Sequence, residues 1–235
     1  MKKHTYLFVV FFSLLLVLPA DAQKIQIGVM GGLNFADMDL KTSTGTDRLT
    51  ASRTLFGVGG VLDLNLGQYT SLVVEPKYLQ KGGTQKATTS DPDIDMKMNF
   101  LEIPIFLKVA YGEVIRPYMK VGPSIGLLLS SNAEGEVGGV VSGQPQKVYE
   151  ADLNDVLEGI DFGLSVGAGA SLLLGKNTIF LDGRYTFGLV DLWKGGTIEW
   201  KSGDDVFTVD SVEEAELSTK GFQIMFGVIF PFGGK

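Results

Sequence analysis

The strongest constraint on the fold is an alternation of apolar and polar residues, which recurs in stretches of about ten residues from Ile25 to the C-terminus. Successive side chains of a β-strand point to opposite faces, so this alternation separates an apolar face from a polar one. A strand that crosses an outer membrane needs roughly 9 to 11 residues, with one face on lipid and the other on the lumen. The pattern therefore predicts an all-β, antiparallel up-and-down transmembrane barrel.

Turn signals between the alternating stretches predict eight strands. The sixth stretch is the clearest, because every second residue from Ile160 to Leu174 is apolar. The intervening positions from 161 to 171 hold Asp161, Gly163, Ser165, Gly167, Gly169 and Ser171. We expect the large apolar side chains to face lipid. The predicted strands cover residues 25–36, 54–66, 71–82, 98–109, 116–131, 159–174, 178–189 and 220–232.

The predicted connections alternate between long and short. Long loops on one side and short turns on the other are typical of outer-membrane barrels, in which the turns and both termini lie in the periplasm. In the last long connection, two strand-like segments flank Ser202-Gly203-Asp204-Asp205 and predict a hairpin above the membrane. If this hairpin enters the bilayer instead, the barrel has ten strands. We also expect a short helix at 151–158. The long connections are 37–53, 83–97, 132–158 and 190–219.

The first 22 residues have the three parts of a secretory signal peptide. Lys2, Lys3 and His4 form a basic start, residues 6–18 are apolar, and Ala20-Asp21-Ala22 is a cleavage motif. We therefore expect a signal peptide at 1–22 and one barrel domain at 23–235. The chain has no cysteine, which excludes disulfides, thiolate metal sites and a lipid-modified cysteine.

Charge excludes one class of partner. Removal of residues 1–22, which hold Lys2, Lys3 and Asp21, leaves 18 of the 20 basic and 26 of the 27 acidic residues. Nucleic-acid binding requires clustered Lys and Arg on a basic surface, so we expect no nucleic-acid partner.

The polar faces of the predicted strands carry small residues and charges. Glycines make room inside a barrel of eight strands, whose interior is only just wide enough for its own side chains. The charges predict a lumen network that either plugs the barrel and fixes strand register or lines a narrow path for ions or protons. Its residues are Asp63, Glu75, Lys77, Glu102, Lys108, Lys120, Asp161, Asp182 and Arg184.

No catalytic constellation is visible. The only histidine, His4, lies in the predicted signal peptide, so the mature chain has no histidine base. A carboxylate pair remains possible in principle, but nothing in the sequence selects one. We expect no enzyme activity and no catalytic, cofactor-binding or metal site.

Five short segments, in order along the chain, carry a family resemblance. They are Gly31-Gly32-Leu33-Asn34-Phe35; Leu101-Glu102-Ile103-Pro104 with Leu107-Lys108; Pro117-Tyr118 through Gly122-Pro123; Asp161-Phe162-Gly163 with Gly167-Ala168-Gly169; and Arg184-Tyr185 with Gly188-Leu189. Together they resemble the PorT-like family of bacterial outer-membrane β-barrels. The resemblance implies a small barrel in the outer membrane of a Gram-negative cell. Some members of that family are associated with a protein secretion and gliding apparatus.

The last strand resembles the signal that the outer-membrane insertion machinery reads, with Gly227, Phe230 and Phe232 at the expected spacing. We therefore expect outer-membrane lipid and the insertion machinery as partners, together with secretion components or extracellular ligands at the loops.

The sequence thus favours a non-enzymatic outer-membrane protein that acts as a structural or interaction component. A narrow, porin-like channel for ions or small solutes is the main alternative. An outer-membrane enzyme and a soluble, lipocalin-type barrel are further alternatives.

Overall fold

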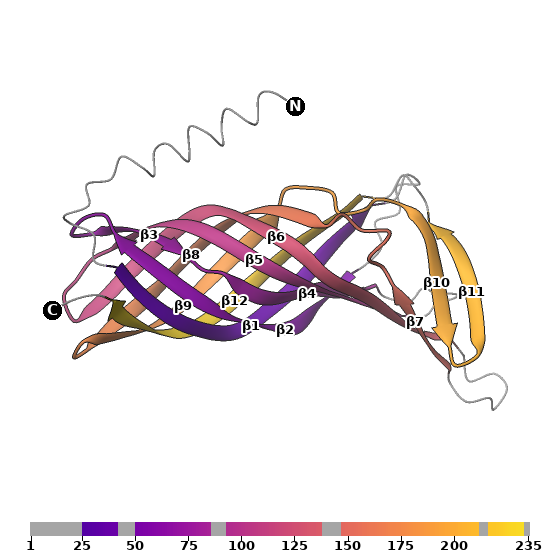
Figure 1. Ribbon diagram of the computed structural model, residues 1–235, viewed down its shortest axis with the longest axis horizontal. Coiled ribbons are helices and arrows are strands. Elements are labelled where there is room, and N and C mark those ends of the chain that lie inside the picture. Colours follow the sequence, from indigo (N-terminus) through magenta and orange to yellow (C-terminus); the bar gives the residue numbers. More distant parts are fainter. Residues whose placement is uncertain (1–24, 42–49, 86–92, 138–146, 212–215, 233–235) are drawn as a thin grey trace, which may run out of the picture.

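The computed structural model describes residues 25–41, 50–85, 93–137, 147–211 and 216–232, and the regular elements there are β-strands (Figure 1). The predicted signal peptide, and with it the boundary between residues 22 and 23, lies outside these ranges. No helix within them is long and apolar enough to cross a membrane.

The strands close into a ring. Each pairs antiparallel with its neighbours, and the first pairs with the last along its whole length, from Ile25 opposite Phe232 to Lys41 opposite Glu216. The ring order is β1-β2-(β3 and β4)-β5-β6-β8-β9-β12, and β12 returns to β1. The ring strands are β1 (Ile25–Lys41), β2 (Thr50–Asn65), β3 (Thr70–Val74), β4 (Lys77–Gln85), β5 (Ile94–Ala110), β6 (Ile115–Val137), β8 (Ile160–Leu174), β9 (Asn177–Gly188) and β12 (Glu216–Phe232).

Strands β3 and β4 form one side of the ring, interrupted at Glu75 and Pro76. Proline has no N–H to donate, so the ladder breaks there. Residues 75 and 76 nevertheless stay hydrogen-bonded to the strands on either side, because Gly60 N donates to Pro76 O at 2.9 Å and Glu75 N donates to Pro104 O at 3.1 Å. Counted this way the ring has eight strands, which confirms the predicted fold class.

Three further strands extend the sheet beyond the ring. They are β7 (Lys147–Asp152), β10 (Gly196–Ser202) and β11 (Asp205–Ser211), and the sheet order there is β6-β7-β10-β11. The predicted hairpin is therefore the β10–β11 pair, and it lies outside the ring, next to the far end of β6 (Figure 1). The ten-stranded alternative is wrong.

Two other expectations need correction. Strands continue several residues into the predicted long loops, because inter-strand hydrogen bonding does not stop where the apolar face ends; β1 runs to Lys41 and β6 to Val137. The helix expected at 151–158 is absent. Residues 151 and 152 end β7, and Leu157 forms an isolated bridge with Trp193.

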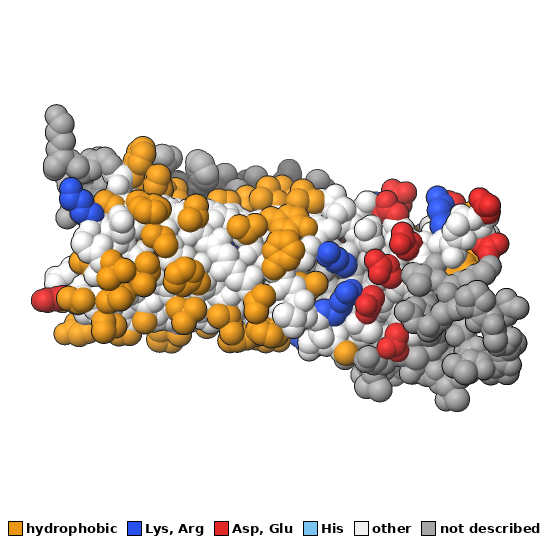
Figure 2. All heavy atoms as spheres, turned by 90° about the horizontal axis from the view of Figure 1, so that it is seen from below, with side chains coloured by type: hydrophobic (Ala, Val, Ile, Leu, Met, Phe, Trp, Pro, Cys, Tyr) orange, Lys and Arg blue, Asp and Glu red, His pale blue; other side chains and the backbone are white. Residues whose placement is uncertain are grey.

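The outer face of the ring is a belt of apolar side chains. Figure 2 shows this belt over the barrel wall and charged side chains beyond it, toward the end that carries β10 and β11. The apolar residues of the predicted lipid face are exposed or half-buried, and Phe56, Leu107 and Phe226 are 48%, 48% and 54% exposed. Such exposure is expected when the surrounding solvent is lipid.

The placement of the last strand gives a test of assembly. Phe232 ends β12, pairs with Ile25 and is 62% exposed on the outer face, whereas Trp200 lies in β10, outside the ring. We expect Phe232→Ala to lower the folded fraction in the outer membrane about twofold or more at equal synthesis, and Trp200→Ala to leave it nearly unchanged. Heat-modifiable gel migration measures that fraction. The reverse order of effects would contradict the proposed role of the last strand.

Candidate functional site

The barrel interior is filled with charged and polar side chains, and small residues make room for them. An added Cβ at Gly59 would lie 2.5 Å from Lys77 Cβ, and one at Gly169 would lie 2.6 Å from Asp182 Cβ. These glycines thus free the space that neighbouring long side chains occupy. The structure places all nine residues of the predicted lumen network inside the ring, in three groups along its axis.

The first group joins Glu75 at the β3–β4 break, Lys120 on β6, and Asp182 and Arg184 on β9. Lys120 Nζ lies 2.8 Å from Glu75 Oε1 and 2.7 Å from Asp182 Oδ2. Arg184 pairs with Glu75 and, at 2.8 Å, with Asp182 Oδ1. The Tyr118 hydroxyl donates to Asp182 at 3.0 Å. Two acids and two bases therefore neutralise each other where all four are almost fully buried, as buried charges require.

The second group lies further toward the β10–β11 end and joins Lys77, Lys81, Glu102 and Asp161. The Glu102 carboxylate forms ion pairs with both lysines at 2.7 Å, and Lys81 also pairs with Asp161 at 2.8 Å. Lys81 is absent from the predicted network, although it shares the inward parity of Lys77 four residues earlier. With Lys81 included, the network holds five acids and five bases. The network is therefore balanced.

The third pair, Asp63 with Lys108, lies at the end of the barrel that carries the short turns. The Lys108 side chain keeps 17% of its surface exposed, whereas Asp63 keeps 2%. Aromatic rings face two of these amines: the Phe106 ring centroid lies 4.7 Å from Lys120 Nζ, and that of Phe100 lies 5.0 Å from Lys81 Nζ.

An apolar cluster closes the opposite end of the lumen. Met38, Met96 and Met98 continue the inward parity of β1 and β5 beyond the charged groups and are buried. Segments between the strands cover these methionines. Backbone hydrogen bonds hold the segments in place: Leu192 N donates to Leu217 O at 2.8 Å, and Glu158 N donates to Leu192 O at 2.8 Å. We call this cluster the apolar cap. It also includes Phe100, Ala133, Ala151, Leu153, Val156, Leu157, Leu192, Ile198 and Leu217.

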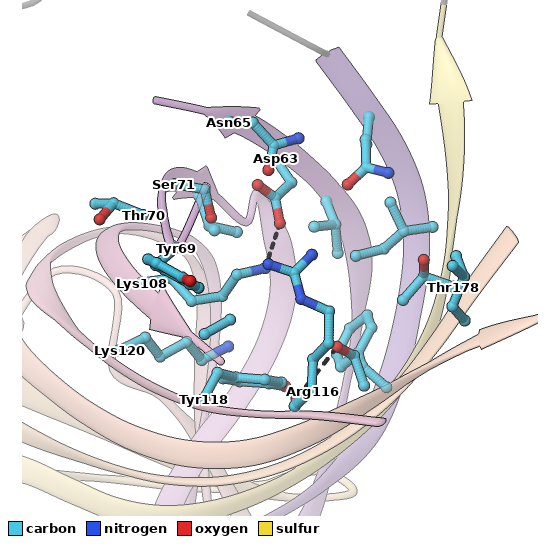
Figure 3. Close-up of a pocket in the computed structure, with 18 of the residues that line it drawn as sticks. Asp63, Asn65, Tyr69, Thr70, Ser71, Lys108, Arg116, Tyr118, Lys120 and Thr178 are labelled. Carbon is cyan, nitrogen blue, oxygen red and sulfur yellow. Dashed lines mark hydrogen bonds and ion pairs between the residues drawn. The ribbon is translucent and has the colours of Figure 1, made fainter. Parts of the chain in front are cut away.

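At the short-turn end the lumen widens into a pocket, the vestibule, with a volume of about 110 Å³. Residues of the β2–β3 and β5–β6 turns line it, together with the ends of β8 and β9. Asp63, Lys108, Arg116 and Lys120 line it (Figure 3), and Glu75 belongs to the same lining. Arg116 shares the inward parity of Tyr118 and Lys120 but is absent from the predicted network.

The predicted insertion residues lie on two faces of β12. Phe230 and Phe232 face outward, 41% and 62% exposed. Gly227 faces inward, where an added Cβ would meet the Phe180 ring at 2.5 Å. Their reading by the insertion machinery stays a prediction.

Chemically, this interior is suited to cross-linking strands and blocking passage. The charges of the lumen network are paired, and among the described residues no group of three or more His, Cys, Asp and Glu is placed to hold a metal ion. A closed ring of eight strands with an apolar outer belt and a filled polar interior defines the class of integral outer-membrane β-barrel proteins.

The comparison with protein families agrees. Residues 21–194 match the family model described as outer membrane protein beta-barrel domain, and the chain belongs to that family. The protein is thus located in the outer membrane. A comparison with curated proteins gave no match.

Solved structures similar to this chain are outer-membrane proteins. The outer membrane protein OprG from Pseudomonas aeruginosa is 12% identical, with a TM-score of 0.46, covering 89% of this chain and 98% of that one. Neisserial surface protein A is 13% identical, with a TM-score of 0.43 and coverages of 88% and 97%. A major outer membrane protein from Thermus thermophilus is 8% identical, with a TM-score of 0.48 and coverages of 90% and 100%.

Proposed function

We propose that this outer-membrane barrel has no catalytic activity and acts through protein contacts at the cell surface. The observation that carries the proposal is the open edge of the sheet outside the ring. Within the described residues, β11 pairs with β10 on one side and with no strand on the other. Such an edge presents unpaired backbone N–H and C=O groups that can accept another strand.

The side chains of β11 also favour strand addition. Phe207 and Val209 lie on the sheet face that Ile198 and Trp200 turn toward the apolar cap, yet they are 41% and 44% exposed. The apolar face therefore extends beyond what the cap covers. A partner strand with apolar residues at alternate positions would continue both the hydrogen-bond ladder and this face.

Acidic residues at the start of β11 indicate the charge of the partner segment. Asp204 lies in the turn before β11, and Asp205 is the first residue of that strand. An extended segment flanked by basic residues complements these acids. The resemblance to the PorT-like family supports a component of protein secretion as the source of that segment.

A narrow channel is the alternative function. The vestibule favours it, since it brings solvent to Lys120 and Glu75 from the short-turn side. The paired charges and the apolar cap beyond it favour the interaction role instead.

Cysteine cross-linking in intact cells tests the proposed edge, because the chain has no native cysteine. We expect Thr208→Cys in β11 to give one discrete cross-linked product with a bifunctional thiol–amine reagent. Adding Phe207→Lys and Val209→Lys should reduce that product roughly tenfold, since two charges on the apolar face oppose strand addition.

The matched control is Glu134→Cys, an exposed position on β6, which is paired on both sides. Its product should be absent or insensitive to the two lysine substitutions. Equal labelling at positions 134 and 208, or a Thr208→Cys product that survives the lysines, would contradict the proposed edge. A product of twice the chain mass would identify a second copy as the partner.

A further inference from the structure

A second site, independent of the external edge, lies at the other end of the barrel. The vestibule is lined by charged residues, among them Asp63, Lys108 and Arg116, and by apolar residues, among them Val61, Val73, Phe180 and Ile229. Its volume of about 110 Å³ has room for roughly eight water molecules, or for an organic molecule of similar size.

Arg116 is the cation in the vestibule that the network leaves without an acidic partner. Its Nη2 donates to the backbone carbonyl of Gln68 at 3.3 Å, and its Nε is buried with no hydrogen-bond partner. No ion pair among the described residues includes Arg116. A buried donor without an acceptor is costly, so the guanidinium is well placed to receive one from a ligand.

The other charges that line the vestibule are accounted for. Lys108 pairs with Asp63, and Lys120 pairs with Glu75 and Asp182. Glu113 is exposed in the turn between β5 and β6. The vestibule lining therefore holds three acids, Asp63, Glu75 and Glu113, and three bases, and Arg116 is the base that makes no ion pair among the described residues. Figure 3 shows the Arg116 side chain inside the pocket beside Lys108 and Asp63.

We propose that the vestibule binds a small organic carboxylate. Its anionic group pairs with the Arg116 guanidinium, and its short apolar body lies against Val61, Val73, Phe180 and Ile229. The planar fork of arginine matches a carboxylate with two parallel hydrogen bonds, which a lysine cannot provide. Such a group is carried by a free small acid or by the C-terminal residue of an exported chain.

The test uses purified, folded barrel in detergent micelles and titration calorimetry, with empty micelles as the blank. One arm titrates benzoate, with benzyl alcohol as its neutral analogue. The second arm titrates a short peptide ending in phenylalanine, with the same peptide amidated at its C-terminus. We expect saturable binding of the acid in at least one arm and much weaker binding of its neutral counterpart. The arm that binds identifies the source of the carboxylate.

Arg116→Gln should weaken that binding about 10-fold or more, because it removes the charge-assisted hydrogen bonds. Arg116→Lys keeps the charge without the fork and should give an intermediate affinity. The matched control is Lys176→Gln, an exposed cation in the β8–β9 turn at the same end of the barrel, which should bind as the wild type does. Heat-modifiable migration confirms that each variant is folded. Unchanged affinity in folded Arg116→Gln, or no saturable binding in either arm, would overturn the proposal.

Discussion

Replacing Glu102 with alanine is expected to lower the free energy of unfolding of the barrel by about 3–5 kcal/mol. Glu102 is fully buried and holds the amines of Lys77 and Lys81, each at 2.7 Å. Without it, Lys81 keeps Asp161, but Lys77 loses the one ion pair that it makes among the described residues. Urea unfolding of the refolded barrel in lipid vesicles, followed by gel migration, measures the change.

Two controls separate this effect from loss of charge in general. Glu199→Ala removes an acid from an exposed pair with Lys201 and should change stability by no more than about 0.5 kcal/mol. The double variant Glu102→Leu with Lys77→Met replaces the pair by apolar groups and should lose less than Glu102→Ala alone, since no unpaired charge remains on Lys77. Equal losses in Glu102→Ala and Glu199→Ala would show that the lumen charges do not hold the barrel together.

The second prediction is that the barrel does not conduct ions. In planar bilayers the purified protein should show no steady conductance above the leak of the membrane, because the interior of an eight-stranded barrel is filled by its own side chains. In this chain two neutralised charge groups and the apolar cap lie one after another along the lumen.

The conductance of the wild type is compared with that of two variants in which the lumen network is disrupted. Glu102→Ala and Lys120→Ala each break one of the two groups while leaving the apolar cap intact, so neither should open large steps. Reproducible single-channel steps in the wild type that disappear on substitution of Lys120 or Glu102 would overturn the plug model and establish the channel alternative.

The fold is predictable from the sequence because its signal is local and repeated. The alternation within each strand, as in the stretch from Ile160 to Leu174, shows which residues face lipid and which face the lumen. The positions of the turns then determine the order of the strands in the ring. Membrane location follows from the same pattern. The reach of the strands beyond the membrane is not predictable in this way, since Met38 and Met96 lie in segments whose polar composition indicates loops.

The interior is predictable as a set of residues but not as a set of partners. Parity indicates that Glu75 and Arg184 face inward, yet which lysine reaches which carboxylate depends on the stagger of the strands around the barrel. The same parity also predicts that Lys81 and Arg116 face inward, because Lys81 continues the parity of Lys77 and Arg116 that of Lys120. The vestibule depends on how three turns and several strand ends meet, which no local pattern encodes.

The lumen network also constrains how the protein can assemble. The ion-paired Glu75 and Arg184 are separated by 109 positions in the chain, and Lys120 on β6 pairs with the same Glu75 carboxylate. A half-formed barrel would hold these charges without partners in a low-dielectric interior, a state that costs several kcal/mol for each ion. Closure of the seam between β1 and β12 and completion of the network therefore favour one another. We expect insertion to be all-or-none, with partly closed forms too unstable to accumulate.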